Sequence, residues 1–310
     1  MRNPHVRRGR PSPTLTTLFP ALLVAALAAL CGASLVGLAA LVTARAGLRP
    51  VLSVRGVSGG AASATGERPS SPLLTAAHLA ALLAFGFLLA WLVVRAVMAA
   101  RAPWSNLHEF SVGFAAAILA GYAVLERRSP LRALLPVVAA VAAGIVAFAM
   151  TRDPSVDPLV PALQQPLLLT VHVGTAMLAY AMGALAFAAA VGELLGTATR
   201  GRLTALPPPD ACQRAAHGAV LLGFPILTAA IVLGSVWANL AWRSYWSNDP
   251  KELAAAATWL VYGAYLHAAG RRDRWGAAAP WLLVLGFAGV LFTYLGASLL
   301  FVGEHSYAGA

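Results

Sequence analysis

The stretch WANLAWRSYWSNDPKE, residues 237–252, separates two apolar runs that are each long enough to cross a membrane. An ordinary loop between membrane helices needs only polar turn residues, yet this one holds three tryptophans, a tyrosine and a charged end. Trp and Tyr rings often anchor helix ends at the membrane surface. That interpretation explains the rings but not the Asp-Pro-Lys-Glu end, so the stretch favours a flat binding partner that is partly apolar and partly anionic.

The charged end of this stretch is predicted to start a helix. Asp249 can act as the N-cap, Pro250 suits the first helical position, and Glu252 stands where a capping box requires an acid. Lys251 is the only lysine of the chain, and a cation in the first turn opposes the helix dipole. Pairing with Asp249 or with an anionic group of a ligand, such as a haem propionate, would offset that cost.

The composition is that of a polytopic membrane protein. Of the 310 residues, 59% are hydrophobic and 11% are charged, which is more apolar surface than a soluble domain can bury. The formal net charge is +11, but the basic residues are scattered between apolar runs and form no patch with interleaved aromatics, which argues against nucleic acid as a partner. Cys31 and Cys212 have neither metal-site spacing nor a plausible disulfide pairing, so we interpret both as structural.

Eight apolar segments set the expected architecture. Each is near the ~20 residues that cross a bilayer, and they span 15–42, 73–100, 109–125, 131–150, 166–191, 214–236, 253–270 and 278–302. The sequence therefore predicts an all-α integral membrane protein with about eight transmembrane helices and an external tryptophan-rich loop. Residues 1–72 comprise the N-terminal tail, the first transmembrane helix and a Gly/Ser-rich loop, and residues 73–310 form the transmembrane domain that carries the site.

Arginine distribution predicts which side of the membrane each connection faces, because inner loops are enriched in basic residues. If the aromatic stretch faces outward, the inner connections hold most of the arginines, namely Arg45, Arg49, Arg55, Arg68, Arg127, Arg128, Arg132, Arg200, Arg202, Arg214, Arg271, Arg272 and Arg274. Eight helices then place the arginine-rich N-terminal tail outside, against the same rule. The later loops agree with one another, and we assign the orientation from them.

The histidines can be sorted by their expected depth. Haem is a flat apolar ring system with anionic propionates, and its iron takes axial imidazoles. His172 lies about six residues into the fifth segment and His305 follows the eighth, so both are expected near the outer surface. Taken singly, each is typical of a polar residue at a helix end. As a pair that brackets the aromatic stretch, they indicate two haem ligands. His267 lies near the inner arginines, where an ionisable residue either marks a functional site or snorkels to the interface.

This combination of residues resembles the tryptophan-rich "WWD" signature of the cytochrome c maturation proteins that handle haem, most closely the System II, CcsA/ResC-type branch. The segment 102–110, APWSNLHEF, also resembles a loop of this family between the second and third spans, in which Ser105 or Asn106 can cap a helix. The resemblance runs from about Leu73 to Tyr307. Two positions depart from it, since the family usually has Gly where Arg243 stands and Trp where Asn248 stands.

The resemblance implies a transiently bound haem b and assigns roles to particular residues. His172 and His305 match the family's two external axial ligands, and His267 matches a membrane histidine that receives haem from the cytoplasmic side. In the family, the partner of that histidine lies on a second protein, and His78 is an alternative within this chain. Residues that would contact the ring or its charged edge are Trp237, Trp242, Tyr245, Trp246, Asp249, Lys251 and Arg243.

The resemblance also implies a function, a location and partners. The expected protein is a multi-pass component of the bacterial plasma (inner) membrane that presents haem for covalent attachment to apocytochrome c. The resemblance leaves open whether it is part of a cytochrome c haem lyase complex. Expected partners are a ResB/Ccs1-type membrane protein, apocytochrome c, thiol-disulfide reductant proteins and membrane lipid. We assign no catalytic residue, because the bond-forming thiols belong to the substrate. Two alternatives remain: a HemX-like regulator of haem biosynthesis with a degenerate haem site, and a small-solute permease with an aromatic gate.

Overall fold

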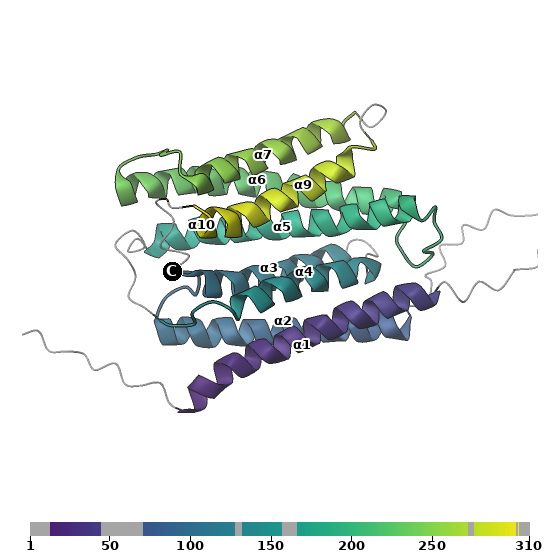
Figure 1. The fold of residues 1–310 in the computed structure, drawn as a ribbon, viewed down its shortest axis with the longest axis horizontal. Helices are drawn as coiled ribbons and strands as arrows, with labels where there is room; N and C mark the ends of the chain where they lie inside the picture. Colours follow the sequence, from purple (N-terminus) through teal and green to yellow (C-terminus); the bar gives the residue numbers. More distant parts are fainter. Residues whose placement is uncertain are drawn as a thin grey trace, which may run out of the picture.

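The computed structural model describes residues 13–44, 71–127, 132–156, 166–271, 276–301 and 303. Every regular element within these ranges is helical, and the helices run side by side in one bundle (Figure 1). The elements are α1 (Pro13–Thr43), α2 (Pro72–Ala99), α3 (Leu107–Glu126), the 3-10 turn η2 (Arg132–Leu134), α4 (Leu135–Ala149), α5 (Pro166–Ala198), α6 (Pro209–Trp242), α7 (Pro250–Ala269), α9 (Ala279–Leu291), the π-helical turn η4 (Phe292–Gly296) and α10 (Ala297–Leu299).

The helices confirm the all-α membrane class. Within the part of the chain that the structure describes, seven stretches are long and apolar enough to cross a membrane: Leu18–Thr43, Pro72–Ala99, Leu107–Glu126, Arg132–Ala149, Leu167–Ala198, Pro209–Trp242 and Ala279–Gly296. The eighth predicted span corresponds to α7, which has 20 residues but opens with Lys251 and Glu252 and is less apolar than the others. The predicted count of eight is therefore approximate, although a helix stands at each predicted position.

Helix α6 is longer than expected. The sequence predicts a span over 214–236 followed by an aromatic loop, whereas the helix continues through Trp242. The last turns stay helical because Trp237 and Ala238 are buried against the bundle. The non-helical part of the aromatic stretch is thus only residues 243–249, between α6 and α7.

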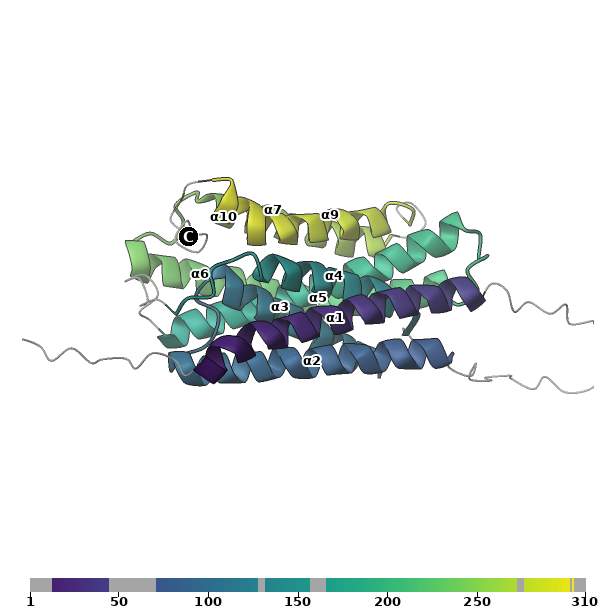
Figure 2. The same ribbon diagram turned by 60° about the horizontal axis from the view of Figure 1, so that its bottom comes forward.

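The bundle is layered around α5. In Figures 1 and 2, α7 and α9 lie on one side of α5, and α1 and α2 form the opposite edge. Alanines at helical spacing on α5, such as Ala181, Ala184 and Ala188, are buried in the core. Small residues let membrane helices approach closely, so α5 packs tightly among its neighbours.

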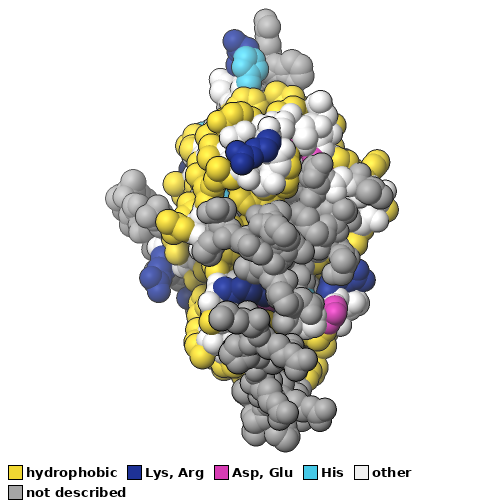
Figure 3. Space-filling view, turned by 90° about the vertical axis from the view of Figure 1, so that its left-hand side faces the viewer, with side chains coloured by type: hydrophobic (Ala, Val, Ile, Leu, Met, Phe, Trp, Pro, Cys, Tyr) yellow, Lys and Arg dark blue, Asp and Glu magenta, His cyan; other side chains and the backbone are white. Residues whose placement is uncertain are grey.

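Consecutive helices alternate in direction, so the bundle has two distinct ends (Figure 1). One end gathers the starts of α3, α5 and α7 and the ends of α2, α4 and α6. Figure 3 views this end, where apolar side chains surround a few charged ones. The other end gathers most of the arginines of the connections predicted to face inward, among the described residues Arg127, Arg132, Arg200, Arg202, Arg214 and Arg271. The aromatic stretch and the basic connections therefore lie at opposite ends.

Candidate functional site

A cavity opens at the aromatic end of the bundle. Its empty space, which includes open solvent at the mouth, is about 1180 Å³. Its walls come from six parts of the chain: the start of α3, the facing sides of α5 and α6, the connection between α6 and α7, the start of α7 and the π-helical turn η4. Most of the lining is apolar or aromatic, with a few polar groups near the mouth.

His172 is held in this cavity by three contacts from α6. Its Nδ1 lies 2.9 Å from the backbone oxygen of Ala230. A carbonyl oxygen only accepts, so Nδ1 carries the hydrogen and the neutral ring has its lone pair on Nε2. The ring stacks on Trp237, with centroids 6.1 Å apart and an interplanar angle of 11°. A Cβ at Gly234 would lie 2.7 Å from Cε1 of His172, so only glycine leaves room for the imidazole there.

The predicted aromatic residues divide into two groups. Trp237, Tyr245 and Trp246 line the cavity. Trp237 is buried in the wall, whereas Tyr245 and Trp246 are exposed at the mouth. Trp242 does not line the cavity; it packs edge-on against Trp237, with ring centroids 4.9 Å apart and an interplanar angle of 81°. Trp242 thus supports the wall from behind.

The connection between α6 and α7 has two residues in the left-handed region. Arg243 has φ 61° and ends α6, and Asn248 has φ 59°. Glycine adopts this conformation at no steric cost, and asparagine tolerates it better than most other residues. Asn248 also accepts a hydrogen bond of 2.9 Å from Nε1 of Trp246, which fixes that ring at the mouth. The side chain of Arg243 is exposed and does not line the cavity.

The predicted capping box of α7 is confirmed. The backbone N–H of Lys251 donates to Oδ1 of Asp249 over 2.9 Å, and the N–H of Asp249 donates to Oε2 of Glu252 over 3.2 Å. Lys251 and Glu252 line the cavity, whereas Asp249 is buried beside it. Gly303 packs against Asp249 so closely that a Cβ there would collide with the carboxylate. The end of the described chain is therefore tied to the start of α7.

Several cavity residues lay outside the predicted ligand set. Trp104, Ser105 and Asn106 belong to the motif before α3, and Asn106 caps that helix by accepting a 2.8 Å hydrogen bond from the N–H of Glu109. The deeper wall consists of three rings from three elements: Phe110, Tyr180 and Tyr294. Tyr294 comes from the π-helical turn, a type of distortion often found at functional sites. The 102–110 motif in the sequence pointed to Trp104, Ser105 and Asn106. Nothing in the apolar periodicity distinguished the other three rings from ordinary core residues.

Two other predicted histidines, His267 and His78, do not line the cavity. His267 is exposed near the end of α7, where its Nε2 contacts Nη1 of Arg271. It lies 16 residues beyond Lys251 on that helix, or about 24 Å at 1.5 Å per residue. His78 lies on α2, across the bundle from α7, and its Nδ1 is 3.1 Å from Oε2 of Glu126 (Figure 1). His305 lies outside the described residues.

Comparisons with known proteins identify the family of the chain. The family model described as Cytochrome C assembly protein matches residues 104–305. Cytochrome c biogenesis protein CcsA of Thermosynechococcus vestitus is 36% identical over 290 residues, covering 77% of this chain and 89% of the relative. The protein of the same name from Microcystis aeruginosa is 34% identical over 299 residues, with the same coverages of 77% and 89%.

A solved structure shares the fold. The structure titled Cytochrome c Heme Lyase CcmF superposes with a TM-score of 0.59 at 24% sequence identity, covering 99% of this chain. This chain spans 50% of the length of that protein. The family match covers more than half of the chain and includes the cavity residues from Trp104 onward. The chain therefore belongs to the cytochrome c assembly protein family, as a System II member of the CcsA type.

Proposed function

We propose that the cavity at the aromatic end of the bundle binds haem b and presents it for covalent attachment to apocytochrome c. Membership of the cytochrome c assembly family gives the protein a role in cytochrome c maturation. The observation that carries the haem proposal is the position of His172, which lies in a large aromatic-lined cavity with its ring stacked on Trp237.

The residues present fit such a group. Ligating histidines usually donate their other ring N–H to a carbonyl or carboxylate, which fixes the tautomer and the orientation of the ring. His172 has this arrangement through the carbonyl of Ala230, so its Nε2 has the electron pair that an iron requires. Trp237, Tyr245 and Trp246 offer faces to a flat macrocycle. Lys251 at the mouth is a cation for a propionate, because Glu252 is engaged by the backbone N–H groups of Ser247 and Asp249.

His305 is proposed as the second external ligand. Gly303 packs against Asp249 and Pro250 at the rim of the cavity. Two further residues reach at most about 7 Å in an extended chain. A ligand role for His305 therefore requires the haem to bind within reach of this rim.

His267 is proposed as a separate inner ligand at which haem is received. The separation of about 24 Å between His267 and Lys251 along α7 is close to the ~30 Å hydrocarbon thickness of a bilayer. One macrocycle cannot contact both ends of α7 at once. In this proposal haem therefore occupies the inner position at His267 first and the outer position afterwards. His78 is paired with Glu126 and lies across the bundle from α7, so it is not close to His267 (Figure 1). We therefore assign the second ligand of the inner position to a ResB/Ccs1-type partner.

The chain's own part in the reaction is to hold the haem and to orient it. Bound haem supplies the vinyl groups that form thioethers with apocytochrome thiols, and thiol-disulfide reductant proteins keep those thiols reduced. The aromatic wall would hold the ring, His172 would ligate the iron, and Lys251 would pair with a propionate. In this proposal the protein is the haem-presenting subunit of a haem lyase complex in the bacterial plasma membrane.

The absorption spectrum of the protein purified in detergent from haem-replete bacterial membranes tests this proposal. We expect a Soret band in the wild type that His172→Ala strongly reduces and that added imidazole restores in part. A wild-type protein that binds no haem, even when haem is added after purification, would contradict the proposal and favour a HemX-like or permease function.

A further inference from the structure

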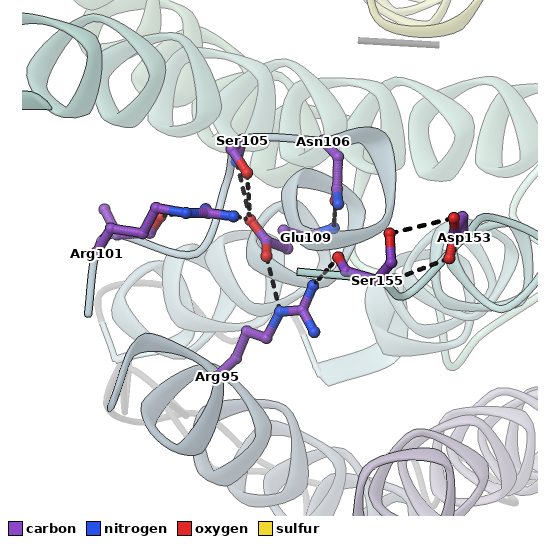
Figure 4. A network of polar contacts seen from close by, with 8 residues as sticks. Arg95, Arg101, Ser105, Asn106, Glu109, Asp153 and Ser155 are labelled. Carbon is purple, nitrogen blue, oxygen red and sulfur yellow. Dashed lines mark hydrogen bonds and ion pairs between the residues drawn. The ribbon is translucent and has the colours of Figure 1, made fainter. Parts of the chain in front are cut away.

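A buried carboxylate, that of Glu109, lies at the centre of a network of polar contacts beside the segment that precedes α3 (Figure 4). Glu109 stands in the first turn of α3, and its side chain is 0% exposed. Its Oε1 accepts a 2.7 Å hydrogen bond from Nε of Arg95 on α2. Its Oε2 accepts three further hydrogen bonds of 3.0 Å, from Nη1 of Arg101, from the backbone N–H of Ser105 and from Oγ of Ser105. Four donors from α2 and the α2–α3 connection therefore converge on one side chain.

This network fixes a segment that the cavity uses. Ser105 and its neighbours Trp104 and Asn106 line the cavity, whereas neither Glu109 nor either arginine does. Ser105 is attached to Glu109 through both its backbone and its side chain. Two hydrogen bonds from a single residue, Ser105, thus connect the cavity wall to the buried carboxylate.

The network also extends to the connection after α4. Nη2 of Arg95 donates to the backbone oxygen of Ser155 over 2.6 Å, and the N–H of Ser155 donates to Oδ1 of Asp153 over 2.9 Å. Removing the negative charge of Glu109 would leave the guanidinium groups of Arg95 and Arg101 without the anion that pairs with both, which is unfavourable in a buried site. The donors would then have to rearrange, and the segment before α3 would rearrange with them.

We propose that Glu109 is a positioning residue for the haem site, and that its carboxylate holds Trp104, Ser105 and Asn106 in place as the α3 wall. This inference rests on the proposed haem function. All three of these residues line the cavity. A segment held in place keeps the shape of this wall, and a loosened segment does not.

The test compares haem titrations of Glu109→Gln and of a matched control, Glu126→Gln. Glu126 is a carboxylate at the other end of α3, where it pairs with Arg132 and His78. It is 17 residues from Glu109 on the helix, or about 26 Å. We expect Glu109→Gln to raise the Kd for haem about tenfold, equivalent to 1.4 kcal/mol, and Glu126→Gln to leave it within about twofold of the wild type.

Two readouts separate positioning from ligation and from general destabilisation. The Soret position of the haem that remains bound to Glu109→Gln should match the wild type, and imidazole should not restore its affinity, because no axial ligand has been removed. Ser105→Ala keeps the arginine pairs and should raise Kd by about threefold, with no additional effect when combined with Glu109→Gln, as expected for residues of one network. If Glu109→Gln fails to fold, the haem affinity of Ser105→Ala alone tests the proposal.

The outcomes are distinct. A wild-type protein that binds no haem would contradict the proposed function itself. A wild type that binds haem while Glu109→Gln and Ser105→Ala bind equally well overturns the positioning role alone. Equal losses in Glu109→Gln and Glu126→Gln also overturn it, because such losses would reflect bundle stability and not the α3 wall.

Discussion

The imidazole of His172 and the indole of Trp237 lie nearly parallel, with ring centroids 6.1 Å apart and an interplanar angle of 11°. The two residues come from antiparallel neighbours, α5 and α6, and they meet at the wall of the cavity. A histidine at a helix end is normally free to rotate, but this one is stacked on one side and hydrogen-bonded to Ala230. The ring is therefore oriented before any ligand arrives, which reduces the ordering cost of binding.

Gly234→Ala is expected to weaken haem binding by moving His172. The added Cβ would meet Cε1 at 2.7 Å and Nδ1 at 3.2 Å, so the ring would have to move away from α6 and from its hydrogen bond to Ala230. Overpacking of this kind costs roughly 1–3 kcal/mol, so we expect the Kd for haem to rise by about tenfold or more. Haem titration followed by the Soret band measures this.

Gly218→Ala is the matched control on the same helix, because a Cβ there meets nothing within 4 Å. Alanine is favoured over glycine inside a helix by roughly 0.5–1 kcal/mol, so the control should fold at least as well as the wild type and bind haem normally. Unchanged binding in Gly234→Ala would mean that the position of His172 is unimportant.

His172→Ala and His305→Ala are each expected to reduce external haem and cytochrome c assembly, because each removes a proposed axial ligand. Imidazole added to the growth medium or to the purified protein should restore part of both. Assembly is measured by covalent haem staining of a reporter cytochrome. Full assembly in the double alanine variant would refute the ligand assignment.

Arg243→Gly is expected to lower haem occupancy without lowering stability. Arg243 has φ 61°, a conformation that glycine adopts without strain, so the folded protein should not be destabilised. The guanidinium fork matches a carboxylate bidentately, and its loss would remove a propionate partner in the connection between α6 and α7. Parallel measurements of thermal unfolding and haem occupancy separate the two effects. If occupancy stays constant or rises, Arg243 has no role in binding.

Reporter fusions test the orientation of the bundle. Tags after Glu304 and within 244–247 should report the outer face, and a tag near Arg272 should report the cytoplasm, because the basic connections gather at the end opposite the cavity. A cytoplasmic signal from the aromatic connection would reverse the assignment of outer and inner haem positions.

Features fixed by neighbouring residues could be predicted from the sequence. The capping box of Asp249 and Glu252 depends on three consecutive peptide units, and it forms as expected. Helix positions followed from apolar segments bounded by Pro and Arg, because lipid leaves a spanning chain few alternatives to helix. The resemblance also brought His172 and the 102–110 motif into consideration, and the structure places His172 in one cavity with Trp104, Ser105 and Asn106 of that motif.

Features that depend on packing could not be predicted. Nothing in the local sequence indicates that α6 continues through Trp242 or that Trp242 supports Trp237 from behind, since both follow from burial against the bundle. The contribution of Tyr294 requires the π-helical turn, whose position is set by the neighbouring helices. The exposed position of Arg243 likewise became visible only once the end of α6 was located.

The close contact between Gly303 and Asp249 links two parts of the chain that are remote in sequence. One carboxylate oxygen of Asp249 caps α7, and the other meets the space that a side chain at position 303 would occupy. A larger residue at 303 would displace the cap, and a different cap would release the constraint on 303. Across relatives, the two positions should therefore co-vary, with glycine retained wherever the aspartate is retained.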